Sequence, residues 1–257
     1  MKNTILLAAA AVCLLLSVSA TAAEWGDLKG RFVFDGTPPA PAPVTVTKDV
    51  EFCGKHKLVN EEIVVGKDGG IKNIVVLLYL DRSDTAPAAH ESYAKTADAK
   101  VKLDNKNCRF EPHVTLLRTS QTLVVGNSDP VGHNSKFNTF ANPPINPIIP
   151  AGSEIEQQFT TPERFPVGVS CSIHPWMNSW VYIADHPYMA VTDASGNFEI
   201  KNLPAGEWTF QIRHDTGYVQ DVKVDGKAQN WSKGRIEVSI EPERVTDLGE
   251  VRFAPKP

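Results

Sequence analysis

The feature that most constrains the fold is a succession of short apolar or alternating runs, separated by turn residues such as those in DASGN, PAGE and VDGK. Such runs are typical of β-strands, because β-branched and aromatic side chains fit a pleated surface. Only residues 85–100 have a helical composition, and that pattern is weak. Many short strands at close spacing predict an all-β sandwich or barrel. The runs predicted as strands are 27–34, 71–80, 122–127, 154–160, 164–171, 179–185, 198–203, 207–214, 217–224 and 235–240.

The first residues have the composition of a targeting segment. Lys2 precedes an apolar run from Ile5 to Ala20, and the small residues that follow resemble a cleavage site. We therefore predict that residues 1–23 are a signal peptide, that no integral membrane segment remains after cleavage, and that the protein is periplasmic or secreted. A membrane anchor is the alternative, although the apolar run is short for a span. The formal net charge of −4 argues against nucleic acid as a partner.

The strongest chemical signal is the stretch VSCSIHPWMNSW, which begins at Val169. Cys171, His174 and Met177 offer a thiolate, an imidazole and a thioether within one loop. A second histidine, His133, lies upstream after another predicted strand, and loops between sandwich strands gather at one end of the molecule. Thiolate and thioether ligands suit Cu(I), and imidazole suits both oxidation states of copper. Two histidines and one cysteine with a weak axial methionine are typical of a blue-copper centre.

The segment from about Val101 to Asp185 resembles a cupredoxin, the family of plastocyanin, azurin and amicyanin. The loop CSIHPWM resembles the Cys-x-x-His-x-x-Met ligand loop of amicyanin, and the GHN motif at residues 132–134 resembles the first copper-histidine motif of azurins. An earlier Phe-Glu-Pro element at residues 110–112 resembles one that precedes a strand in this family. The long proline-rich stretch between His133 and Cys171 departs from the pattern.

This resemblance implies one mononuclear type 1 copper ion. Gly132 becomes a distant carbonyl ligand, and Asn134 braces the cysteine loop. The resemblance also implies that the loop histidine reaches the surface at the end of the sandwich. There it would form an apolar docking patch with Pro175, Trp176 and residues 142–150. The alternative is that this proline-rich loop covers the core and Trp176 packs inward. The ligands that the resemblance implies are His133, Cys171, His174 and Met177.

Other interpretations of these residues are less specific. Cys171 could be a buried thiol, Met177 a core residue and His174 a hydrogen-bonded surface histidine. A structural zinc site would more often use several cysteines or histidines and no methionine. The sequence has no second cysteine near Cys171 for a dinuclear copper centre and no His-x-His motif of a multicopper oxidase. His113 is predicted to be a packing or surface residue. His186 is close in sequence to the ligand loop and could form a hydrogen bond near it.

The cysteine count is odd once the signal peptide, with Cys13, is removed. Cys53, Cys108 and Cys171 remain, and an oxidising compartment favours one disulfide and one thiol that is kept free. Cys53 and Cys108 lie outside the ligand motifs, so we predict that they pair. Cys171 then stays free, and a bound metal ion would occupy it.

Two further segments resemble parts of one small sandwich. Residues 26–80 look like the opening of a transthyretin-like module of the kind found beside carboxypeptidases, and residues 190–218 look like its closing part. We predict that residues 24–95 and 188–257 together form this accessory sandwich and that residues 96–187 form a cupredoxin-like copper domain. A single enlarged sandwich is the alternative, since 257 residues can hold one large domain or two small ones.

The predicted function is electron transfer by a secreted or periplasmic type 1 copper protein with an unidentified redox partner protein. The alternative is a module that stores or delivers copper, or that binds in the cell envelope without carrying electrons. We find no paired acid and base carboxylates, no Ser/His/Asp order and no phosphate-binding glycine loop. We therefore expect that the protein is not an enzyme.

Overall fold

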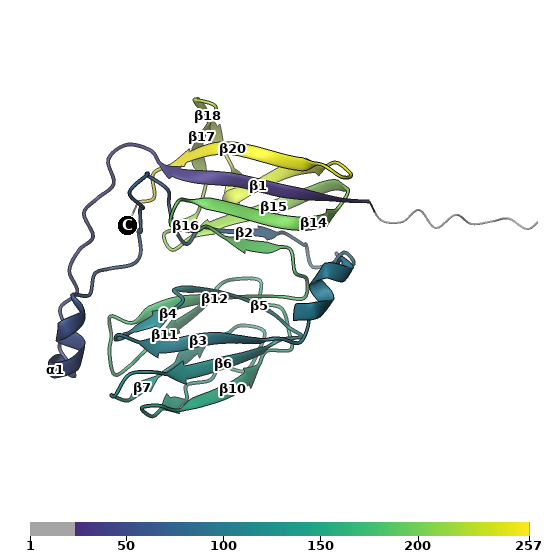
Figure 1. Cartoon of the computed structure of the whole chain (residues 1–257). Helices are drawn as coiled ribbons and strands as arrows, with labels where there is room; N and C mark the ends of the chain where they lie inside the picture. Colours follow the sequence, from purple (N-terminus) through teal and green to yellow (C-terminus); the bar gives the residue numbers. More distant parts are fainter. Residues whose placement is uncertain (1–23, 257) are drawn as a thin grey trace, which may run out of the picture.

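The computed structural model describes residues 24–256 and is composed mainly of β-strands (Figure 1). The predicted all-β class is therefore confirmed. The predicted signal peptide lies outside the described residues. Among residues 24–256, no helix combines the length and the apolar character needed to cross a membrane. The predicted helical segment at 85–100 is wrong in extent, because only a 3₁₀ helix, η2 (Glu91–Thr96), forms there.

Two pairs of sheets make up the molecule. In what we call the flanking sandwich, one sheet has the order β14-β1-β20-β17-β18 and the other has the order β13-β2-β15-β16, with β19 also paired to β15. These strands are β1 (Trp25–Phe34), β2 (Val75–Leu78), β13 (Met189–Val191), β14 (Asn197–Pro204), β15 (Gly206–His214), β16 (Gly217–Tyr218), β17 (Asp221–Val224), β18 (Lys227–Asn230), β19 (Arg235–Ile240) and β20 (Val245–Phe253).

What we call the central sandwich has the sheet orders β10-β6-β3-β4 and β5-β12-β11-β8, with a small β7-β9 pair at one end. Its strands are β3 (Lys100–Lys106), β4 (Arg109–Glu111), β5 (Val114–Arg118), β6 (Thr122–Asn127), β7 (His133–Asn134), β8 (Lys136–Asn138), β9 (Ile148–Ile149), β10 (Glu154–Gln158), β11 (Val167–Ser170) and β12 (Asn178–Ala184). The remaining helical turns are α1 (Val50–Cys53), η1 (Gly54–His56) and η3 (Ser232–Gly234).

Each sandwich has its own hydrophobic core. The buried core of the central sandwich draws on residues 103–183, and that of the flanking sandwich draws on residues 28–78 and 188–253. Burial of this apolar area is the main force that holds each pair of sheets together. The domain boundaries after residues 95 and 187 remain predictions, which the distribution of the two cores supports.

The two sandwiches pack against each other through β2 and β12. Alternate side chains of a strand point to opposite faces, so Val76 lies in the flanking core whereas Val75 faces the central sandwich. On β12, Val181 lies in the central core, and Tyr182 meets Val75 in the shared cluster. Because both faces of β2 are covered, its sequence is a continuous apolar run rather than an alternating one.

A long excursion of the flanking sandwich, residues 36–62, is called the arm below. Its base is closed where the backbone N–H of Phe34 donates to the carbonyl of Gly69 at 2.9 Å. Its two legs are bonded to each other, with the N–H of Val44 donating to the carbonyl of Leu58 at 2.9 Å. The arm runs down beside the central sandwich and carries α1 at its tip (Figure 1).

Candidate metal centre

The loop with the predicted ligands joins β11 to β12, two neighbouring antiparallel strands. Cys171 directly follows β11. Its backbone N–H donates to the carbonyl of Met177 at 3.2 Å, and the N–H of Met177 donates to the carbonyl of His174 at 2.9 Å. The loop is thus closed by its own backbone, which fixes where its side chains point. His133 comes from β7, which pairs with β9 through the His133–Ile149 register.

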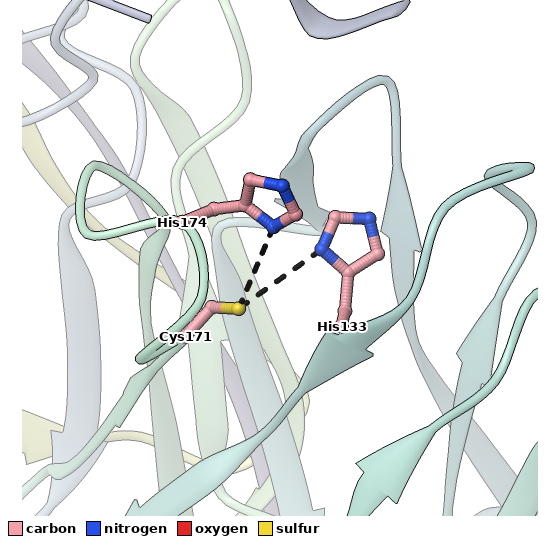
Figure 2. Close-up of side chains that lie close together, drawn as sticks. All are labelled: His133, Cys171 and His174. Atoms are coloured by element: carbon pink, nitrogen blue, oxygen red, sulfur yellow. Dashed lines mark hydrogen bonds between the residues drawn. The ribbon is translucent and has the colours of Figure 1, made fainter. Parts of the chain in front are cut away.

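Three donor atoms converge at this end of the central sandwich. The sulfur of Cys171 lies 4.0 Å from Nδ1 of His133 and 3.8 Å from Nδ1 of His174, and all three residues are buried (Figure 2). An ion held in a trigonal plane by a thiolate at about 2.3 Å and imidazoles at about 2.0 Å would separate sulfur and nitrogen by about 3.7 Å. The spacing of these donors therefore fits a first-row metal ion.

The outer nitrogen of each imidazole faces a carboxylate. Nε2 of His133 lies 2.9 Å from Oδ2 of Asp129, and Nε2 of His174 lies 2.7 Å from Oδ2 of Asp49. A carboxylate can only accept a hydrogen bond, so a proton on Nε2 of each ring is the donor, and Nδ1 of each ring faces the sulfur, where it is available to a metal ion. Such contacts orient metal-binding histidines.

Sequence reasoning missed both carboxylates. Asp129 stands four residues before His133, so a search for acids near the motif could have found it. Asp49 lies 125 residues from His174, and no local pattern connects them.

The electrostatics of the site favour a thiolate. Burial by itself raises the pKa of the Cys171 thiol, but hydrogen bonds with His133 and His174 and with the backbone of Asn134 lower that pKa to about 5. Burial also lowers the pKa of the His133 imidazole, but hydrogen bonds with Asp129 and Cys171 raise it above its usual value. At neutral pH the sulfur is therefore in the ionised form that binds metal ions.

Asn134 connects the two ligand segments. Its Oδ1 accepts the backbone N–H groups of Ser172 at 2.8 Å and Ile173 at 3.2 Å, and the Cys171 sulfur lies 3.4 Å from it. These bonds tie the cysteine loop to β7. Gly132 is exposed just before His133, and its role as a distant carbonyl ligand stays a prediction.

Met177 is buried beneath the loop in the same core as Cys171. Its position as an axial ligand stays a prediction.

The disulfide predicted between Cys53 and Cys108 is present, with a Cα–Cα distance of 5.5 Å. Within residues 24–256, Cys171 is the free cysteine, and it is buried. A second group of close donor atoms joins Cys108, Asp129 and His133. Since the Cys108 sulfur is bonded to Cys53, this group offers no thiolate and instead supports the site.

The predicted exposure of the loop histidine is wrong. His174 is 0% exposed, because Asp49 and the arm cover its outer edge. Trp176 is half-buried against the disulfide, and its Nε1–H donates to the carbonyl of Cys108 at 3.0 Å. Long-range packing of the arm, which local patterns do not specify, accounts for both differences.

The other histidines do not reach the three-donor group. His113 pairs with Asp215 at 2.6 Å between the two sandwiches. His186 is buried, its Nδ1 accepts the backbone N–H of Tyr188 at 3.2 Å, and it is not part of the three-donor group.

No family model matches the chain, and no curated protein matches it. Solved structures with partial likeness include the Cu-containing nitrite reductase from Thermus scotoductus SA-01, at 18% identity and a TM-score of 0.30 over 42% of this chain and 25% of that one. The chain thus spans a quarter of the reductase.

Two smaller copper proteins also show partial likeness. A purple cupredoxin from Nitrosopumilus maritimus has 24% identity and a TM-score of 0.28 over 34% of this chain and 99% of that one. A reduced Cu(I) form of a mutant amicyanin has 19% identity and a TM-score of 0.30 over 42% and 97% of the two chains.

Proposed function

We propose that the protein is a mononuclear type 1 copper protein that transfers electrons outside the cytoplasm and that it is not an enzyme. The observation that carries this proposal is the convergence of one thiolate sulfur and two Nδ1 atoms in a buried site. When bound there, copper would supply one-electron oxidation and reduction. His133, Cys171 and His174 would hold the ion, with Met177 as the axial ligand.

The chain's own contribution is to hold these donors still. Backbone hydrogen bonds close the ligand loop, Asn134 ties it to β7, and the two carboxylates fix both imidazole rings. Donors that cannot move keep one geometry for both oxidation states of an ion. This rigidity supports electron transfer rather than catalysis, because the buried donors present no open face to a substrate.

Copper storage or delivery is the second candidate. The observation that favours it is the complete burial of His174 beneath the arm, which would slow both loading and loss of the ion. A carrier should cycle reversibly with the ion retained, whereas a delivery protein should surrender Cu(I) to a chelator. Reversible voltammetry together with Cu(I) competition by a chelator separates the two functions.

The proposed location outside the cytoplasm rests on the disulfide. Structural disulfides persist in oxidising compartments and are rare in the cytosol. The predicted signal peptide agrees with this location. Fractionation of cells that express the full chain would test it, and recovery of the uncleaved chain in the cytoplasm would contradict it.

The metal assignment has a direct test. Protein loaded with Cu(II) should show an intense thiolate-to-copper charge-transfer band and the narrow EPR coupling of a type 1 site. Cys171→Ser should abolish the band, whereas Ser172→Ala, which changes an exposed neighbour in the same loop, should keep it. Copper binding without colour, with the EPR spectrum of a tetragonal nitrogen and oxygen site, would show that the assignment is wrong.

A further inference from the structure

The arm brings a residue of the flanking sandwich to the metal centre of the central one. Oδ2 of Asp49 lies 2.7 Å from Nε2 of His174, although 125 residues separate them in the chain. The Asp49 side chain is 41% exposed, whereas the His174 side chain is fully buried. Asp49 therefore stands between the imidazole and solvent and occupies the outer edge of the ring.

The side chain of Asp49 does not cap the helix that follows it. It immediately precedes α1, where an aspartate side chain usually accepts a backbone N–H of the first helical turn. Here it makes no such bond, and its backbone has a left-handed φ of 46°. A non-glycine residue in this region is under backbone strain. The side chain of Asp49 is thus turned away from α1 and toward His174.

The contacts of the arm keep Asp49 in place. Cys53, four residues further on, is joined by the disulfide to Cys108, whose carbonyl accepts the Nε1–H of Trp176 at 3.0 Å. Cys53, Leu58 and Cys108 form a small buried cluster, and Trp176 packs against it. The arm is therefore attached both covalently and by apolar contacts to the loop that bears His174.

We propose that Asp49 is the positioning residue of His174 and that the arm is a cap that separates this histidine from solvent and from other molecules. The inference rests on the proposed copper centre, because the role assigned to Asp49 is to present Nδ1 of His174 to the ion. It assigns a role to the flanking sandwich, which supplies part of the site from outside the central sandwich.

The first test uses metal-free protein, so it is independent of copper. Two-dimensional ¹H–¹⁵N NMR of the histidine rings should show His174 with its proton on Nε2, protected from exchange with water. Asp49→Ala should give a mixture of ring tautomers and remove the protection. Asp49→Asn keeps an acceptor oxygen and should largely restore the tautomer. A His174 ring with its proton on Nδ1, or one unprotected in the wild-type protein, would overturn the inference.

The second test uses protein loaded with copper. Asp49→Ala should increase the loss of copper to a chelator by about ten- to a hundred-fold, the usual effect of removing a partner of a metal-binding histidine. It should also raise the reduction potential, because a negative charge near the ion favours Cu(II). Glu51→Gln removes a charge from the same arm at an exposed position and serves as the matched control.

The outcomes separate the two proposals. Equal effects of Glu51→Gln and Asp49→Ala on copper loss and potential would mean that only overall charge matters, which overturns positioning by Asp49. If the metal-free rings behave as expected but the wild-type protein forms no type 1 site, the positioning contact stands and the copper function is wrong. If Asp49→Ala does not fold, Asp49→Asn should still raise the potential while keeping the ring tautomer, and a changed tautomer there would also overturn the inference.

Discussion

The carboxyl group of Asp129 forms hydrogen bonds both with His133 and with the turn that precedes β4. Its Oδ2 lies 2.9 Å from Nε2 of His133, and the same carboxyl accepts the backbone N–H groups of Asn107 at 2.6 Å and Cys108 at 2.8 Å. Both turn residues have left-handed φ angles, of 55° and 56°. The carboxylate therefore stabilises a strained turn and a metal-binding ring together, and the same turn bears the disulfide to the arm.

The first prediction concerns this carboxylate. Burial alone raises the pKa of Asp129, but hydrogen bonds from His133 and the two backbone N–H groups lower it, so the group is ionised in the native protein. Asp129→Ala should lower copper affinity by about ten- to a hundred-fold. It should also destabilise the fold by about 1–3 kcal/mol, because buried N–H donors lose their acceptor. Competition titration and chemical denaturation measure these effects.

Asp104→Ala is the matched control for this prediction. Asp104 is a buried carboxylate of β3 that accepts a hydrogen bond from Ser128 and contacts no histidine. The Asp104→Ala variant should have a lower free energy of unfolding and an unchanged copper affinity. A similar loss of affinity in both variants would mean that Asp129 acts through general stability and not through His133.

The disulfide gives the second prediction. Cys53 and Cys108 are 55 residues apart, and closing a loop of this length contributes about 4 kcal/mol in the chain-entropy model. The Cys53→Ser and Cys108→Ser double variant should therefore unfold at lower denaturant concentration, and limited proteolysis should cut the arm first. An unchanged midpoint together with a resistant arm would show that apolar contacts alone hold the arm in place.

The sequence predicted the parts of this protein that local patterns determine. The all-β class follows from alternation within single strands, and the Cys171, His174 and Met177 spacing lies within one loop. A four-residue helix such as α1 is too short to show a periodic pattern, so it was not expected. The path of the arm depends on packing between distant segments, and for that reason neither the burial of His174 nor its contact with Asp49 could be predicted.

The third prediction concerns the axial ligand. Met177→Gln should lower the reduction potential, because a harder oxygen donor favours Cu(II) over Cu(I). The thiolate-to-copper band should persist, since the other three ligands are unchanged. Met189→Gln, in the partly buried cluster between the sandwiches, is the control and should leave the potential unaltered. An unchanged potential in the Met177 variant would remove Met177 from the ligand set.

The fourth prediction concerns acid stability. Burial lowers the pKa of His186 and of His214 to about 4, whereas an unfolded histidine titrates near 6.5. Below pH 6.5 these two histidines bind protons in the unfolded chain but stay neutral in the native protein. The free energy of unfolding therefore falls as the pH drops from about 6.5 to about 4. Each histidine contributes about 3 kcal/mol to this loss. Denaturation of metal-free His186→Gln across this range should show a shallower loss than wild type.

His113 serves as a control, because its contribution to stability depends on pH in the opposite direction. Burial lowers the pKa of His113, but its hydrogen bond and charge interaction with Asp215 raise it above the usual value. Its stabilising contribution is therefore complete below pH 6.5 and is lost as the pH rises through the raised native pKa. His113→Gln should remove this contribution and leave the acid loss due to His186 in place. Identical pH profiles for all three proteins would contradict both assignments.

The last prediction concerns the surface through which electrons pass. With His174 covered, the exposed apolar side chains beside the centre include Ile148, which is 71% exposed, and Ile173, which is 37% exposed. Both adjoin Asn134, since Ile148 pairs with it across β9 and β7 and the N–H of Ile173 donates to its Oδ1 at 3.2 Å. Small apolar patches of this kind suit the brief contacts of redox proteins.

Electron self-exchange between two copies tests this patch without knowledge of the natural partner. Ile148→Glu should keep the copper spectrum but slow self-exchange by at least about ten-fold, because like charges and a lost apolar contact oppose the encounter. NMR line broadening in mixtures of oxidised and reduced protein measures this rate. Phe140→Glu changes a side chain of similar exposure, 73%, located beyond β8 beside Phe165, and should leave the rate nearly unchanged. Equal slowing in both variants would mean that total charge controls exchange and that electrons do not pass through the surface around Ile148.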